Sequence, residues 1–260
     1  SATVLIACNG SSSEKKFSVS GTITNNTAKK IYLEKIPAAT MQPMIADSAE
    51  IGKDGRFSLS TEAGESVVFN LRLDQNMYPV ASVINDANKI KLDIKLASQN
   101  NEFAEKYDVE GSVASQQMKD FMLTFNNDLQ KIFGLAHQAD SLQRIGTPDS
   151  VLSPLLVEQR SLADQIKKFS ENAFSKANDP ALVMFELGYY QATANGAGFG
   201  LEPLADEQVN AIVNQTAAKF PTHQGVAAIQ ATLNKQMQQA AAASWVGKEA
   251  PHFSMPDVNG

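Results

Sequence analysis

The stretch Lys89-Ile-Lys-Leu-Asp-Ile-Lys-Leu96 decides the fold of the first part of the chain. Apolar residues occupy every second position, and the residues between them are charged. Successive side chains of a β-strand point to opposite faces of a sheet. The pattern therefore predicts a strand with one buried face and one solvated face.

The same alternation runs back to the start of this region. Three further runs have an apolar residue, or in one case a glycine, at every second position. They are Phe17, Val19, Gly21 and Ile23; Ile31 and Leu33; and Val67, Phe69, Leu71 and Leu73. The pairs Asn25-Asn26, Asp54-Gly55 and Asn85-Asp86 separate the runs, and Asp-Gly is a strong hairpin signal because such turns need positive φ. Many short strands predict an antiparallel β-sandwich or barrel-like domain over residues 17–98.

The apolar spacing changes around Gly111-Ser112 to the three-and-four pattern of amphipathic helices. Five such segments follow, over residues 118–133, 152–173, 182–185, 209–213 and 226–237. Asp179-Pro180 is typical of an N-cap followed by proline at the first helical position, and the fourth helix should end near Phe220-Pro221. We therefore expect an α+β chain with a helical region over residues 99–244.

Composition limits the chemistry that this chain can carry. Its 260 residues are 43% hydrophobic and have a net charge of -6 without a basic cluster, so a nucleic-acid partner is not expected. Cys8 is the single cysteine, which excludes an internal disulfide and a Cys-x-x-Cys pair.

Two further motifs do not predict binding sites. His137, His223 and His252 lack metal-ligand spacing and are expected to be solvated or to cap helices. The glycine-rich run at residues 195–200 lies between helices, whereas a phosphate loop follows a strand, so it is expected to be a connector. No catalytic, cofactor-binding or metal-binding residue is predicted.

Residues 1–16 are expected to hold an anchor signal. The small apolar run 2–7 ends at Cys8, and Leu5-Ile-Ala-Cys8 resembles the lipobox of bacterial lipoproteins, followed by a polar tether. This resemblance implies lipidation of Cys8, attachment to a membrane and a periplasm-facing position in the cell envelope, with the membrane undetermined. A buried cysteine on a short strand is the alternative.

Residues 245–260 carry the pattern that bears on function. The run Trp245-Val-Gly-Lys-Glu-Ala-Pro-His-Phe253 continues to Asp257-Val-Asn-Gly260. It resembles the opening of thioredoxin-like domains of the AhpC/TSA-like or TlpA-like kind, in which Gly247, Ala250, Pro251 and Phe253 match the family motif. The resemblance implies the start of a truncated thioredoxin-like fold. We expect the chain to be part of a longer protein.

The whole layout is similar to Gram-negative lipoproteins in which a domain of unknown function, of the DUF4369 type, precedes a thioredoxin-like domain. This resemblance implies that the chain is the redox-inert accessory region of an envelope thiol–disulfide oxidoreductase, with the reactive cysteines beyond Gly260. It also implies protein disulfide clients and a thiol electron donor as partners, while a homodimer remains open.

Two alternatives stay open. A peroxiredoxin-type peroxidase would use one low-pKa cysteine in place of a pair. A lipid-anchored binding module for carbohydrate or peptide would need exposed aromatic residues, for which Tyr78, Tyr189 and Tyr190 are the candidates.

Overall fold

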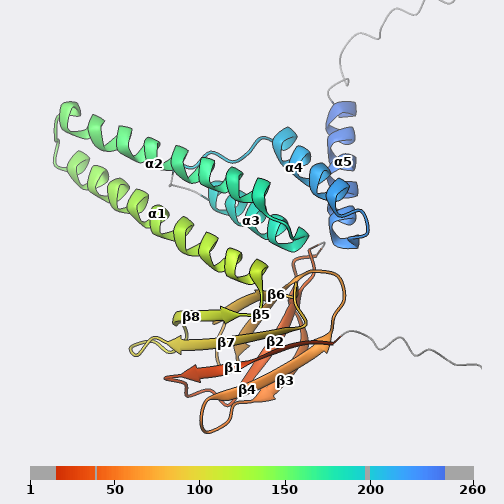
Figure 1. The fold of residues 1–260 in the computed structure, drawn as a ribbon. Helices are drawn as coiled ribbons and strands as arrows, with labels where there is room; N and C mark the ends of the chain where they lie inside the picture. The colour runs from red at the N-terminus through yellow and green to blue at the C-terminus, as the bar shows by residue number, and fades with distance from the viewer. Residues whose placement is uncertain (1–15, 39, 197–199, 244–260) are drawn as a thin grey trace, which may run out of the picture.

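The computed structural model describes residues 16–38, 40–196 and 200–243, in which a β-sandwich is followed by a bundle of helices (Figure 1). The strands of this part are β1 (Lys16–Thr24), β2 (Lys30–Ile36), β3 (Met44–Glu50), β4 (Arg56–Glu62), β5 (Val68–Leu73), β6 (Ala81–Ile84), β7 (Lys89–Leu96) and β8 (Ala104–Glu110). The helices are α1 (Val113–Arg144), α2 (Asp149–Lys176), α3 (Pro180–Ala194), α4 (Asp206–Lys219) and α5 (Gln224–Ala243). The predicted α+β class is confirmed.

Two four-stranded sheets face each other, with strand orders β4-β1-β7-β8 and β3-β2-β5-β6. Alternate side chains of both sheets point inward and form one apolar core. Phe17 of β1 and Phe69 of β5 meet across it, with ring centroids 5.0 Å apart. The apolar positions of Lys89–Leu96 are all buried, as their alternation predicts.

The structure corrects two details of the predicted sandwich. The sheets are not closed into a barrel, and the edge strands β3 and β4 are joined through a side chain: Asp47 Oδ2 accepts the Ser60 N–H at 2.7 Å. The central strands β1 and β7 pair in parallel, with Val19 opposite Ile90. Side-chain alternation is the same in parallel and antiparallel strands, so the period could not reveal this direction.

Gly21 allows the central strands to approach each other. A Cβ atom at this position would lie 1.8 Å from the backbone oxygen of Leu92 in β7. Real Cβ atoms do not come so close to an oxygen, so this position of β1 requires glycine.

Strands extend further along the chain than residue 98, where we expected them to end. β8 pairs antiparallel with β7, with Ile94 opposite Tyr107. Its alternation is weak because only Ala104, Tyr107 and Val109 are partly buried. The change of period at Gly111-Ser112 is confirmed, since Ser112 caps α1 and accepts the Ser115 N–H at 2.9 Å.

The helices form a second, separate core above one end of the sandwich (Figure 1). α1 and α2 have 32 and 28 residues and make a hairpin about 48 Å and 42 Å long. α3 packs against both, α4 lies against α3, and α5 stands beside α4 at the periphery. Within the part of the chain that the structure describes, none of the helices is both long and apolar enough to span a membrane.

Candidate functional site

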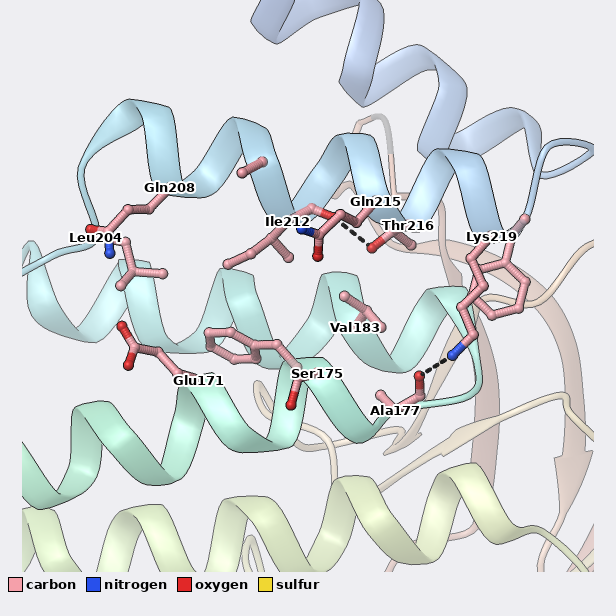
Figure 2. Close-up of a pocket in the computed structure, with 13 residues that line it drawn as sticks. Glu171, Ser175, Ala177, Val183, Leu204, Gln208, Ile212, Gln215, Thr216 and Lys219 are labelled. Atoms are coloured by element: carbon pink, nitrogen blue, oxygen red, sulfur yellow. Dashed lines mark hydrogen bonds between the residues drawn. The ribbon is translucent and has the colours of Figure 1, made fainter.

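A groove lies between α2 and α4, with α3 as its floor (Figure 2). Its volume is about 330 Å³, at the lower end of the range for small-molecule sites. Its apolar walls are formed by Phe174 of α2, Val183 of α3, Ile212 of α4 and Leu204, which precedes α4. Such a surface can bind an apolar side chain or ligand.

The polar groups of this groove lie at its ends. Figure 2 shows Glu171 at one end and Lys219 at the other. Lys219 Nζ donates to the backbone oxygen of Ala177 at 3.1 Å and to Asn178 Oδ1 at 2.8 Å. Its charge is thereby held at the rim. Among the described side chains that line the groove, no nucleophile is hydrogen-bonded to a base.

A second hollow of about 220 Å³ lies between α1, α2 and α3 and contains a buried carboxyl group. Glu186 of α3 is 3% exposed, and no described residue donates a hydrogen bond to its Oε2. Burial raises the pKa of Glu186 from 4.5 to about 8. At neutral pH this side chain is therefore mostly protonated, and Asp120 and Lys176 line the same hollow.

The sandwich and the helices meet at a polar junction, which consists of the loop between β4 and β5 and the N-termini of α3 and α5. His223 is buried there and caps α5: its Nδ1 accepts the Val226 N–H at 3.1 Å. The proton is then on Nε2, which donates to the backbone oxygen of Ser66 at 2.7 Å. Glu65 adds a second cap, since its Oε2 accepts the Gln224 N–H at 2.7 Å.

The same loop also contacts the residue that caps α3. The Ser66 hydroxyl donates to the carboxylate of Asp179 at 2.7 Å, and Asp179 Oδ1 accepts the Leu182 N–H at 3.0 Å. The predicted N-cap at Asp179-Pro180 is thus confirmed. Desolvation by burial raises the pKa of Asp179, while the Ser66 hydrogen bond acts in the opposite direction. These contacts join the loop to the N-termini of two helices, where Asp179, Glu65 and His223 accept backbone N–H groups that would otherwise lack a partner within the helix.

The residues that carry the predicted anchor and family motif lie outside the described residues. They are Cys8, Gly247, Ala250, Pro251 and Phe253. The same holds for His252 and for residues 197–199 of the glycine-rich run, of which the described ends lie between α3 and α4.

The other histidines and tyrosines fall in different places. His137 lies on α1 against the ring of Phe133. His223 caps α5, which is one of the two roles expected for the histidines. Tyr190 is buried in the helical core, and its hydroxyl donates to the backbone oxygen of Glu202 at 2.6 Å. Tyr189 donates to Asn126 Oδ1, so of the three tyrosine candidates only Tyr78 is exposed.

Among the described residues, no group of three or more His, Cys, Asp and Glu side chains is arranged to hold a metal ion. Sequence reasoning missed the buried Glu186 and the junction contacts of Glu65 and Ser66. Glu186 gave one signal, a single acidic residue within the apolar run of α3. The partners of Glu65 and Ser66 are more than one hundred residues away along the chain, so no local pattern could show them.

Comparison with known proteins finds one relationship. Residues 17–118 match the model of the family described as Domain of unknown function (DUF4369). The match covers β1 to β8 and the first turns of α1. No curated protein and no solved structure matches the chain. Residues 17–118 are thus similar to the DUF4369 family, which bears out that part of the resemblance, while the thioredoxin-like part stays a prediction.

Proposed function

We propose that this chain is the accessory, redox-inert region of an envelope thiol–disulfide oxidoreductase whose thioredoxin-like domain begins near Trp245. The observation that carries the proposal is the DUF4369 match over residues 17–118, directly upstream of helices and of the motif with Gly247 and Pro251. A reactive dithiol beyond Gly260 would exchange disulfides with clients through a mixed disulfide. In this role the sandwich and helices bind and position, and the chemistry occurs elsewhere.

The junction supports a positioning role. Hydrogen bonds of Glu65, Ser66 and His223 join the β4–β5 loop to the N-termini of α3 and α5. α5 is the last described helix and ends at Ala243, and the joint holds the N-terminus of this helix at the β4–β5 loop (Figure 1). A redox domain held in this way would keep one orientation toward the membrane tether.

The test is insulin reduction by the full-length protein and by the 260-residue chain. We expect the full-length protein to carry a Cys-x-x-Cys pair after residue 260 and to precipitate insulin in the presence of dithiothreitol. The 260-residue chain should be inactive. Insulin reduction by the 260-residue chain, or a full-length protein without further cysteines, would refute the proposal, and a single low-pKa cysteine with peroxide consumption would establish the peroxidase alternative.

The anchor at Cys8 is part of the same proposal and has its own test. Cys8→Ala in the full-length precursor should move the protein from the membrane fraction to the soluble fraction, because acyl chains supply the membrane affinity. Ser13→Ala, in the same polar tether, is the matched control and should leave the protein at the membrane. A Cys8→Ala protein that stays in the membrane fraction would exclude lipidation as the anchor.

A binding module is the second candidate function, and one surface favours it. Tyr78 and Phe103 lie on two loops at the end of the sandwich away from the helices, with ring centroids 6.1 Å apart, and the adjacent Met77 is 82% exposed. A third loop contacts them through Thr27, whose hydroxyl oxygen accepts a hydrogen bond from Asn101 Nδ2 at 2.6 Å. Exposed aromatic residues on hydrogen-bonded loops are typical of ligand-binding surfaces.

This candidate is tested by calorimetric titration of the chain with cellohexaose and with reduced, carboxymethylated lactalbumin. Binding of either probe that is lost in Tyr78→Ala and in Phe103→Ala would support a binding module. Met41→Ala changes another exposed apolar residue of the sandwich and serves as the control. If neither probe binds, this surface has no such function.

A further inference from the structure

A third hollow lies between the first half of α4 and the second half of α5, at the point where the chain leaves the described structure. Its volume is about 460 Å³. Val209 of α4 and Leu233 and Met237 of α5 form its apolar wall, and all three are only partly buried. Asp206 and Glu207, in the first turn of α4, form an acidic rim. The hollow thus combines an incompletely covered apolar surface with negative charge.

One polar atom of this hollow lacks a partner. The side chain of Asn210 lines the hollow, and its Oδ1 is buried without a hydrogen-bond donor among the described residues. A buried acceptor without a partner costs about 1–3 kcal/mol. An occupant that brings one N–H or O–H group together with an apolar body would remove this cost.

The chain itself brings such a group to the edge of the hollow. α5 has 20 residues and α4 has 14, so α5 is about 9 Å longer than its neighbour. The hollow reaches along α5 as far as Ala240. Trp245 follows Ala243, the end of α5, by two residues, which corresponds to a chain length of roughly 7 Å at full extension.

We propose that the segment after α5 folds back onto this hollow, with Trp245 seated against Leu233 and Met237. The indole has a large apolar body and a single donor, Nε1–H, which matches an apolar wall with the one free acceptor of Asn210. Lys248, three residues later, is then within reach of the acidic rim of Asp206 and Glu207. The docked segment fixes the start of whatever follows residue 245.

This inference deepens the proposed function. The role of the contact rests on that function, whereas the contact itself does not. If a thioredoxin-like domain follows, docking of Trp245 converts the linker into a rigid connection and extends the joint at His223 to the next domain. The contact itself requires no redox chemistry. Docking without any disulfide reductase activity in the full-length protein would therefore remove the proposed function and leave this inference intact.

The chain contains a single tryptophan, so the emission of Trp245 reports the contact directly. In the 260-residue chain we expect emission at shorter wavelength than that of N-acetyl-tryptophanamide, together with reduced quenching by acrylamide. Met237→Glu places a charge in the apolar wall beside Glu207 and should shift the emission and the quenching to the values of the free indole. Ala231→Glu adds the same charge to an exposed position of α5 that does not line the hollow, and it should change neither.

Circular dichroism of both variants checks that α5 is intact. Emission of the unmodified chain identical to that of N-acetyl-tryptophanamide would overturn the inference without any variant. A buried tryptophan whose emission is unchanged by Met237→Glu would overturn it as well, because the indole would then be buried elsewhere. A shift caused equally by Ala231→Glu would have the same meaning.

Discussion

Replacing Glu186 with Gln should change how the stability of the protein depends on pH. The carboxyl group of Glu186 is buried in the helical core, and burial raises its pKa from 4.5 to about 8. Between these two values the folded protein holds a proton that the unfolded chain has released. Stability falls with rising pH wherever the folded state binds more protons, so the free energy of unfolding should decrease across this window.

The size of this effect follows from the two pKa values. A proton held in the folded state alone changes the free energy of unfolding by about 1.4 kcal/mol per pH unit. Integrating this slope from pH 5 to pH 7 shows that ionisation of Glu186 lowers the free energy of unfolding by about 2.5 kcal/mol. Glutamine has a similar shape and does not titrate, so Glu186→Gln should lack this loss. The free energy of unfolding of the variant, relative to that of the unmodified protein, should therefore increase by about that amount between pH 5 and pH 7.

Urea denaturation at pH 5, 6 and 7, followed by the helical circular dichroism signal, measures this difference. Glu158→Gln is the matched control, because Glu158 lies on α2 and is exposed. The stability of this control relative to the unmodified protein should be nearly constant over the range. A constant difference between Glu186→Gln and the unmodified protein would refute the reasoning, since it would mean that Glu186 ionises alike in both states.

Three further substitutions test the packing and the junction. Phe125→Ala leaves a cavity at a fully buried position of the helical core and should lower the free energy of unfolding by about 3–5 kcal/mol in urea denaturation. A decrease no larger than that caused by substituting an exposed residue would show that Phe125 is not in the core. Gly21→Ala forces a Cβ onto the Leu92 oxygen and should lower the melting temperature by an amount corresponding to about 1–3 kcal/mol or more, and unchanged melting would exclude the close approach of β1 and β7. His223→Ala removes the acceptor of the Val226 N–H and should cost about 0.5–2 kcal/mol, with faster amide exchange at the start of α5; unaltered exchange there would show that the cap is unimportant.

Local patterns determined the elements of this fold. Lys89–Leu96 became a half-buried strand because an alternation of two matches the pleat, and Asp179-Pro180 became a helix start because both residues suit that position. The helix boundaries near Ser112 and Phe220 were also predictable, since caps and turn residues act within one helical turn. In each case the residues that set the structure are neighbours in sequence.

The candidate site was less predictable than the fold. The groove of α2, α3 and α4 depends on how three helices pack, and the pattern of any one helix reveals only which of its faces is apolar. The buried carboxyl of Glu186 and the free acceptor of Asn210 depend on what surrounds them. A sequence shows that a residue is polar, whereas its desolvation depends on its neighbours in space.

The sequence by itself determined that strands come first, that helices follow, and the helix boundaries near Ser112, Asp179 and Phe220, because periodicity and capping are local. Only the tertiary structure decided that β1 and β7 run parallel and that the sheets stay open. It also decided that, in one sandwich loop, Glu65 caps α5 and Ser66 donates to Asp179, the cap of α3. These features depend on contacts between residues distant in sequence. Their energies come from packing and desolvation, which exist only once the chain has folded.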